Sequence, residues 1–187
     1  TAGIAMGGAI LSGPTSALCE LYDGYSWSEE ADLTTARDGG MSNIGTQTAT
    51  LLCGGGPAAG QKDEVEEWNG SSWSETTDLN VGRWAGGGSG TTTAAIIFGG
   101  GAPSESPNQV VYNEEWNGSS WTEGTDMSRT AGKLWFGSAG ETSTAAIAFG
   151  GSPGNIAHSE TWNGTSWTEG DNLPPGRRYP DGFGSYE

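Results

Sequence analysis

Positive charge is scarce in this sequence. Its 187 residues include 7 lysines and arginines against 23 aspartates and glutamates, which gives a formal net charge of −16 at pH 7. Phosphate backbones and anionic membrane surfaces repel such a chain, so we expect no nucleic acid among its partners and no membrane insertion. The acidity suits a protein that stays soluble in a salty medium, where counterions screen its own charges.

Long apolar runs, histidine and cysteine are also scarce. No stretch approaches the ~18 apolar residues of a membrane-spanning helix. The sequence starts at Thr1 without a signal peptide or an initiator methionine, so we expect a processed product or part of a longer chain. His158 is the only histidine, which leaves no histidine-based metal site or catalytic triad within one subunit. Cys19 and Cys53 lack metal-ligand spacing. We expect two small buried side chains there, with a disulfide or metal site as the alternative.

Glycine and tryptophan are what the chain has in excess, with 34 and nine residues respectively. High net charge with low hydrophobicity is typical of disordered chains, but such chains are poor in aromatic residues. Each tryptophan can bury a large apolar area, so the composition predicts a folded protein.

One motif recurs four times along the chain. Its closing tryptophans are spaced 46, 48 and 46 residues apart: Trp27, Trp73, Trp121 and Trp167. An aromatic residue lies five positions before each: Tyr22, Trp68, Trp116 and Trp162. A glutamate lies two positions before that: Glu20, Glu66, Glu114 and Glu160. This agreement predicts a single domain, 1–187, of four repeats at approximately 1–47, 48–92, 93–143 and 144–187.

The local pattern of one repeat is typical of four strands. The apolar run 94–98 is β-prone and ends at a glycine pair. The segment 66–73 contains Asn69-Gly70, a dipeptide that favours a tight hairpin turn. Side chains alternate along a strand, so Trp68 and Trp73 fall on one face, which needs cover from a neighbouring repeat. No window shows the 3.6-residue apolar period of a helix.

Four strands in about 47 residues predict an all-β fold, a β-propeller with four blades of four antiparallel strands. An open β-solenoid is the alternative, although solenoid repeats are usually shorter. The double glycine followed by an aromatic residue and a hairpin tryptophan resembles the kelch repeat. Kelch repeats usually have a longer turn than the four residues between Tyr22 and Trp27. The phrases 115–123 and 144–151 more closely resemble kelch-like repeats in tail-fibre and other structural proteins of phages that infect marine cyanobacteria.

This resemblance covers all four repeats and implies a function. It implies a non-enzymatic structural or adhesive module on a virion, hence extracellular, whose partners are other virion subunits or host surface glycans and proteins. A carbohydrate-binding, lectin-like propeller of cellular origin is the alternative. The carboxylates recur once per repeat, which a structural role predicts, whereas glycoside hydrolysis needs one special constellation. We therefore expect that this protein is not an enzyme.

We also expect no cofactor. Calcium binding at Asp63-Glu64 is the alternative, although no spaced Asp-x-Asp loop supports it. Asn69, Asn117 and Asn163 each begin a glycosylation sequon, but an Asn-Gly turn explains them without a sugar.

Basic residues also recur in register. Arg37, Arg83 and Arg177 each lie ten positions after the hairpin tryptophan, and Lys133 takes this place in the third repeat. Since a planar guanidinium suits a carboxylate, we expect them to pair with the repeated glutamates at blade junctions. The segment 177–187 aligns with the glycine-rich first strand of a repeat. We expect it to pair with residues 1–8 of the same chain or of a partner copy, so that a homo-oligomer is possible.

One loop varies between repeats, from the glycine pair to the next aromatic residue. Equivalent propeller loops emerge on the same face, and variation there is typical of a binding surface, although unrestrained drift is the alternative. The candidate binding residues in these loops are Pro14, Thr15, Pro103, Ser104, Pro107, Asn108, Pro153 and Asn155. The longest loop, 101–110, is the leading candidate for the host or subunit contact.

Overall fold

A computed structural model describes residues 2–9, 14–39, 43–56, 60–102, 109–128, 135–182 and 184. These residues form fifteen strands and no helix, which confirms the all-β class. The strands are β1 (Gly3–Met6), β2 (Cys19–Tyr22), β3 (Trp27–Glu29), β4 (Asn43–Thr46), β5 (Ala49–Cys53), β6 (Val65–Trp68), β7 (Trp73–Glu75), β8 (Gly87–Thr91), β9 (Ala94–Phe98), β10 (Asn113–Trp116), β11 (Trp121–Glu123), β12 (Gly137–Thr142), β13 (Ala145–Phe149), β14 (Ser159–Trp162) and β15 (Trp167–Glu169). Within this described part, no helix long and apolar enough to cross a membrane is found.

The strands form four antiparallel sheets, one per repeat, in which strands adjacent in sequence pair. Sheet 1 is β1-β2-β3, sheet 2 is β4 to β7, sheet 3 is β8 to β11, and sheet 4 is β12 to β15. Three sheets have the four strands expected. Sheet 1 has three, because its described residues start at what is the second strand of the other repeats.

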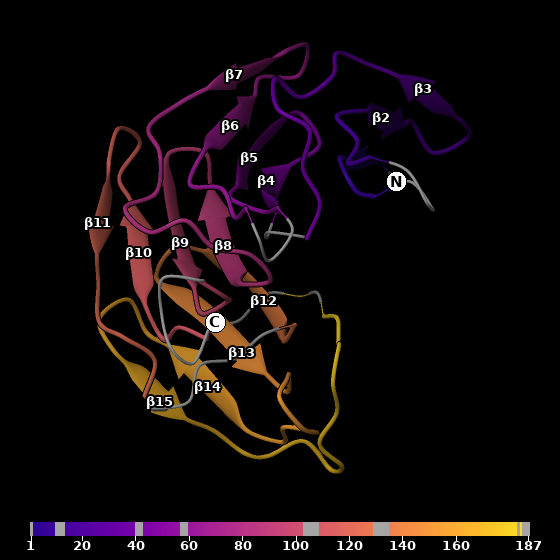
Figure 1. The fold of residues 1–187 in the computed structure, drawn as a ribbon. Coiled ribbons are helices and arrows are strands. Elements are labelled where there is room, and N and C mark those ends of the chain that lie inside the picture. Colours follow the sequence, from indigo (N-terminus) through magenta and orange to yellow (C-terminus); the bar gives the residue numbers. More distant parts are fainter. Residues whose placement is uncertain are drawn as a thin grey trace.

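The sheets stand side by side in an arc, with sheet 1 and the C-terminal segment at its two ends (Figure 1). Strands β4, β8 and β12 line the inside of the arc, where β8 contacts both β4 and β12. The short strands β3, β7, β11 and β15 form its outside. The described residues do not close into a ring, and the pairing expected between 177–187 and 1–8 is not found among them.

Each hairpin places its two aromatic residues opposite each other. In sheet 2, Trp68 pairs with Trp73 across the ladder. The ring centroids of this pair and of the equivalent pairs in the other three repeats lie 5.2–5.5 Å apart. The Asn69 side-chain oxygen accepts the N–H groups of Ser71 and Ser72, both at 3.0 Å. These bonds close a four-residue turn, so the asparagine has the turn role that its sequence context indicates.

The hydrophobic core lies between sheets rather than within one. Leu52 and Trp68 of sheet 2 pack with Cys19 of sheet 1, whereas Leu51 and Cys53 face sheet 3. A third cluster joins sheets 3 and 4. Both cysteines are free and buried, as expected of small apolar side chains. Because side chains alternate between two neighbours, each sheet depends on the next for its burial.

The repeated glycine pair has a backbone cause. Gly99 and Gly100 have φ angles of +62° and +96°, and the equivalent pairs in the other three repeats are also positive. A Cβ atom on Gly100 would lie 2.7 Å from the Trp84 carbonyl oxygen. At the end of each apolar strand the chain therefore adopts positive φ angles and passes close to neighbouring backbone, and both features favour glycine.

Candidate functional site

A buried ion pair joins sheet 1 to sheet 2. Arg37, in the linker after β3, pairs with Glu66 on β6, and the two side chains are 3% and 0% exposed. The guanidinium also donates to the carbonyl oxygens of Gly54 and Glu64, both at 2.9 Å. The carboxylate accepts the N–H of Thr34 at 2.6 Å. Both charges are thus hydrogen-bonded out of contact with water, as expected for the repeated arginines.

The junction between sheets 2 and 3 has the same construction. Arg83 pairs with Glu114, donates to the Tyr112 carbonyl at 2.9 Å, and is fully buried. The Asn80 N–H donates to Glu114 Oε2 at 2.7 Å. Burial lowers the pKa of Arg83, while the adjacent Glu114 carboxylate opposes this shift. An arginine nevertheless stays charged at any physiological pH, so the junction is held by a true ion pair.

The third junction and the end of the chain differ. The Ser128 N–H donates to Glu160 Oε2 at 2.7 Å, as Asn80 does to Glu114, but the expected partner Lys133 lies outside the described residues. Arg177 is exposed, and no ion pair of its side chain is found within the described part of the chain. At the first two junctions the glutamate carboxylates are buried and paired with arginines, so they are unsuited to acid–base chemistry.

Hydrogen bonds between equivalent linker residues connect successive sheets. The N–H of Ala85 donates to the Gly39 carbonyl at 3.1 Å, and the N–H of Trp135 donates to the Ala85 carbonyl at 3.2 Å. Each of these residues lies two positions after the repeated basic residue, as Tyr179 does in the last repeat. All four have positive φ angles: 71° at Gly39, 55° at Ala85, 51° at Trp135 and 50° at Tyr179. Such angles are uncommon outside glycine, and the linker repeats them at one position.

Three aromatic residues of these linkers form a row. The rings of Trp84 and Trp135 have centroids 5.5 Å apart, and those of Trp135 and Tyr179 are 5.9 Å apart. Tyr179 is 65% exposed, and the two tryptophans are half-buried. The Trp84 ring lies over Gly101, where a Cβ atom would approach it to 2.6 Å. This aromatic row is absent from the sequence-based candidates.

The aromatic row lies at the edge of the arc that carries the variable loops. In a four-stranded antiparallel meander, the loop between the second and third strands, such as β5–β6, lies at the same edge as the linker that follows the fourth strand. We call this edge the loop face. Trp84 bridges to Gly101, which bridges to Gln109 at the far end of the longest loop. Pro14, Pro153 and Asn155 are exposed in the equivalent loops, and Thr15 is half-buried in a bridge to Ala9. The candidates Pro103, Ser104, Pro107 and Asn108 lie outside the described residues.

A pocket occupies the opposite edge, the turn face. Its volume is about 530 Å³, and the ends of β4, β8 and β12 line it together with their turns. The lining includes the exposed Thr46, Thr91 and Glu141 and the buried Ser89, whose hydroxyl donates to the Thr142 carbonyl at 2.7 Å. The pocket thus presents hydroxyl groups and one carboxylate. None of the sequence-based candidates lies in it.

Metal-ligand geometry is not found in the described ranges. No three histidine, cysteine, aspartate or glutamate side chains among these residues come together in a way that could hold a metal ion. Of the residues considered for calcium, Asp63 is exposed, and the Glu64 carboxylate accepts a bond from Lys62 Nζ at 3.3 Å.

Comparison with known proteins adds no family: no protein-family model and no curated protein matches the chain.

Proposed function

We propose that this protein is a kelch-like propeller module of a virion, without enzymatic activity, which adheres to a host surface or a neighbouring subunit through its loop face. The aromatic row carries this proposal. It lies on the same face as the loops whose length and composition vary between repeats. Adjacent aromatic side chains that are exposed or half-buried on a rigid scaffold are typical of binding surfaces, whose energetic hot spots are enriched in tryptophan and tyrosine.

The chemistry of the loop face favours an uncharged ligand. The flat rings of Trp84, Trp135 and Tyr179 can pack against the C–H faces of a sugar or against an apolar protein surface. The net charge of −16 opposes a strongly anionic ligand. A neutral host glycan or a host protein with little negative charge fits both features.

Exchange of one exposed tyrosine tests this proposal. Tyr179→Ala removes a side chain of the loop face, and Tyr25→Ala removes one that is 94% exposed in the β2–β3 turn on the other face. We expect Tyr179→Ala to weaken adsorption to host cells by about tenfold or more, since interface aromatics commonly contribute over 1 kcal/mol. Tyr25→Ala should leave adsorption unchanged. Equal adsorption by both variants would contradict the proposal.

Replacement of the 101–110 loop by the short turn of the fourth repeat provides a second test. The framework should still fold, because both junction ion pairs lie outside the loop, although the replacement must keep apolar residues at the buried Ala102 and Val110. Lost adsorption or assembly with an unchanged melting temperature supports a binding role. Retained adsorption and assembly would mean that the loops vary only because nothing restrains them.

A lectin-like propeller of cellular origin is the second candidate, and the turn-face pocket favours it. Pockets of a few hundred Å³ with convergent polar groups are common small-ligand sites. On a glycan array, this candidate predicts a signal that is lost in Thr91→Val and Glu141→Gln but kept in Tyr179→Ala. The virion module predicts the reverse, together with the presence of the protein in purified particles.

A further inference from the structure

The pocket of the turn face lies where the inner strands of sheets 2, 3 and 4 end. Each strand ends there in a glycine with a positive φ angle and a threonine. A Cβ atom on any of the three glycines would clash with the carbonyl oxygen of the alanine that begins the next strand. The hydroxyl group of each threonine lies 3.2–3.4 Å from that of the threonine two positions later. The residues are Gly45 and Thr46, Gly90 and Thr91, and Gly140 and Thr142. The hairpin turn alone therefore explains why they recur.

Sheet 4 departs from this pattern by one inserted residue. In β8 a single residue, Gly90, lies opposite Ala95. In β12 two residues, Gly140 and Glu141, fill the corresponding place, and the register of the ladder shifts there. Because Gly140 makes the same close approach to the next strand as Gly90, Glu141 is the extra residue of a β-bulge. Bulges re-aim side chains and are common beside active sites, and this one adds a carboxylate to the pocket.

A contact from sheet 3 holds this bulge in place. The hydroxyl group of Ser89, a residue that is 3% exposed, donates to the Thr142 carbonyl at 2.7 Å. A Cβ atom on Gly140 would lie 2.5 Å from the same hydroxyl oxygen, so Ser89 contacts the residues on both sides of Glu141. The backbone of Glu141 is therefore fixed before a ligand binds, which lowers the entropic cost of binding.

The Glu141 side chain has no structural partner of this kind. It is exposed, and neither a hydrogen bond nor an ion pair joins it to any residue that the structure describes. The described residues that line the pocket include no lysine, arginine, histidine or aromatic ring. An uncompensated carboxylate thus stands in a pocket of about 530 Å³ whose other polar side chains are hydroxyl groups, those of Thr46, Ser89, Thr91 and Thr92.

These groups fit an organic cation better than a metal ion. Calcium takes roughly 6–8 oxygen ligands, usually with several carboxylates, and the pocket has one carboxylate and the volume of a small-molecule site. A primary ammonium group has three N–H donors and bonds strongly to a carboxylate, while hydroxyl oxygens can accept its other two. The net charge of −16 also attracts a cation from a distance.

We propose that the turn-face pocket binds a small primary ammonium compound that also carries hydroxyl groups. Glu141 supplies the counter-charge, and the hydroxyl groups of Thr46 and Thr91 bind the polar groups of the ligand. The site lies at the edge opposite the loop face, so it is independent of the adhesion proposed there. A neutral glycan would leave the Glu141 charge without a partner, which separates this site from a lectin-like one.

Two matched pairs of small molecules test the need for a positive charge. Ethanolamine and glucosamine carry an ammonium group where ethylene glycol and glucose carry a hydroxyl group. Their binding can be followed by the NMR signals of the Thr91 and Glu141 backbone amides, at constant ionic strength and a mildly acidic pH that keeps both amines charged. The ammonium compounds should bind at least about tenfold more tightly than their uncharged counterparts, because hydrogen bonds between charged groups are the stronger ones.

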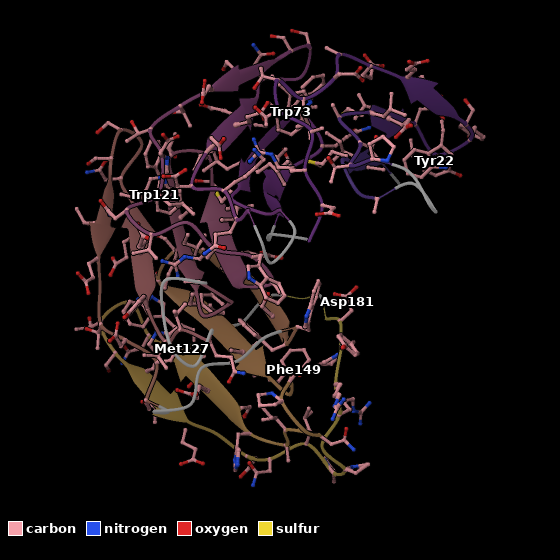
Figure 2. All side chains as sticks on the ribbon, in the orientation of Figure 1. Tyr22, Trp73, Trp121, Met127, Phe149 and Asp181 are labelled. Atoms are coloured by element: carbon pink, nitrogen blue, oxygen red, sulfur yellow. The ribbon has the colours of Figure 1, made fainter. Side chains whose placement is uncertain are left out.

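Glu141→Gln keeps the shape of the side chain and removes its charge. It should weaken the binding of both ammonium compounds at least about tenfold and leave the binding of glucose unchanged. The matched control is Glu123→Gln, which removes the same charge from an exposed position on β11. Trp121 of this strand lies towards the outside of the arc, away from the inner strands (Figure 2). This control should bind the ammonium compounds like the wild type.

Deletion of Glu141 is a second variant, because it should give β12 the uninterrupted ladder of β8. We expect it to lose ammonium binding and to melt no lower than the wild type. Equal binding of charged and uncharged compounds, binding retained by either Glu141 variant, or an equal loss in Glu123→Gln would each overturn the inference. Glu141→Gln should adsorb to host cells like the wild type, so this site and the adhesion of the loop face can fail separately.

Discussion

The Arg83–Glu114 ion pair allows the sharpest test of how the sheets are joined. Arg83→Ala would remove the partner of a carboxylate that is 2% exposed and would leave the Tyr112 carbonyl without its guanidinium donor. Glu114 would keep its bonds from Asn80, at 2.7 and 2.9 Å, but its charge would be buried without a counter-charge. Breaking a buried pair in this way costs about 3–5 kcal/mol.

That cost is large for a domain of this size. Stability is typically ~5–15 kcal/mol, and each kcal/mol corresponds to roughly 2–4 °C in melting temperature. We therefore expect Arg83→Ala to melt on the order of 10 °C below the wild type in a calorimetric or circular dichroism scan. Arg178→Ala, at an exposed neighbour of the last repeat, should change it by about 1 °C or less. An Arg83→Ala protein that melts with the wild type would refute a structural role for the repeated arginines.

Two further predictions concern single residues of the repeat. Gly100→Ala combines a φ of +96° with an approach of 2.7 Å to the Trp84 carbonyl, whereas Gly8→Ala at the equivalent place has a φ of +98° and open space. Chemical denaturation should show a loss of roughly 1–3 kcal/mol for Gly8→Ala from the backbone alone and a larger loss for Gly100→Ala. Burial raises the pKa of Cys53 from 9.0 to about 12, so a thiol reagent should reach it only on unfolding. Because the folded thiol keeps its proton longer than the unfolded one, this group should make stability fall as pH rises above 9.0. Rapid labelling of native Cys53 at pH 8, or a contribution of opposite sign, would contradict this.

The sequence predicts this fold well where the determining contacts are repeated. The register of Trp68 and Trp73 follows from a four-residue turn and the alternation of side chains. The Arg83–Glu114 pair follows from scarce basic residues that recur in step with glutamates. In both cases one physical requirement appears several times in the chain, so chance agreement is a poor explanation.

The aromatic row and the pocket could not be found in this way. Trp84 lies one position after the basic residue of its repeat and Trp135 lies two after, so the two do not align as a repeat. Their contact arises because the linkers that enter β8 and β12 lie side by side and are joined by the hydrogen bond from the Trp135 N–H to the Ala85 carbonyl. The pocket likewise needs three strands from three sheets. The opening of the arc depends on the angle between sheets, which no spacing within one repeat determines.

In each repeat, the contacts between sheets and the loops are separate parts, and this separation would let such a scaffold change its ligand. The ion pairs, the aromatic pairs and the cores lie between sheets and recur from repeat to repeat. The loops project from one face, and the two ion-pair junctions use residues at the ends of these loops, where the carbonyl oxygens of Glu64 and Tyr112 accept hydrogen bonds from Arg37 and Arg83. A change of loop length between Gly101 and Gln109 therefore alters the surface around the aromatic row without breaking a junction. If the proposed adhesive function holds, selection on binding acts on the loops while the junctions maintain stability, and variation confined to this face is then expected.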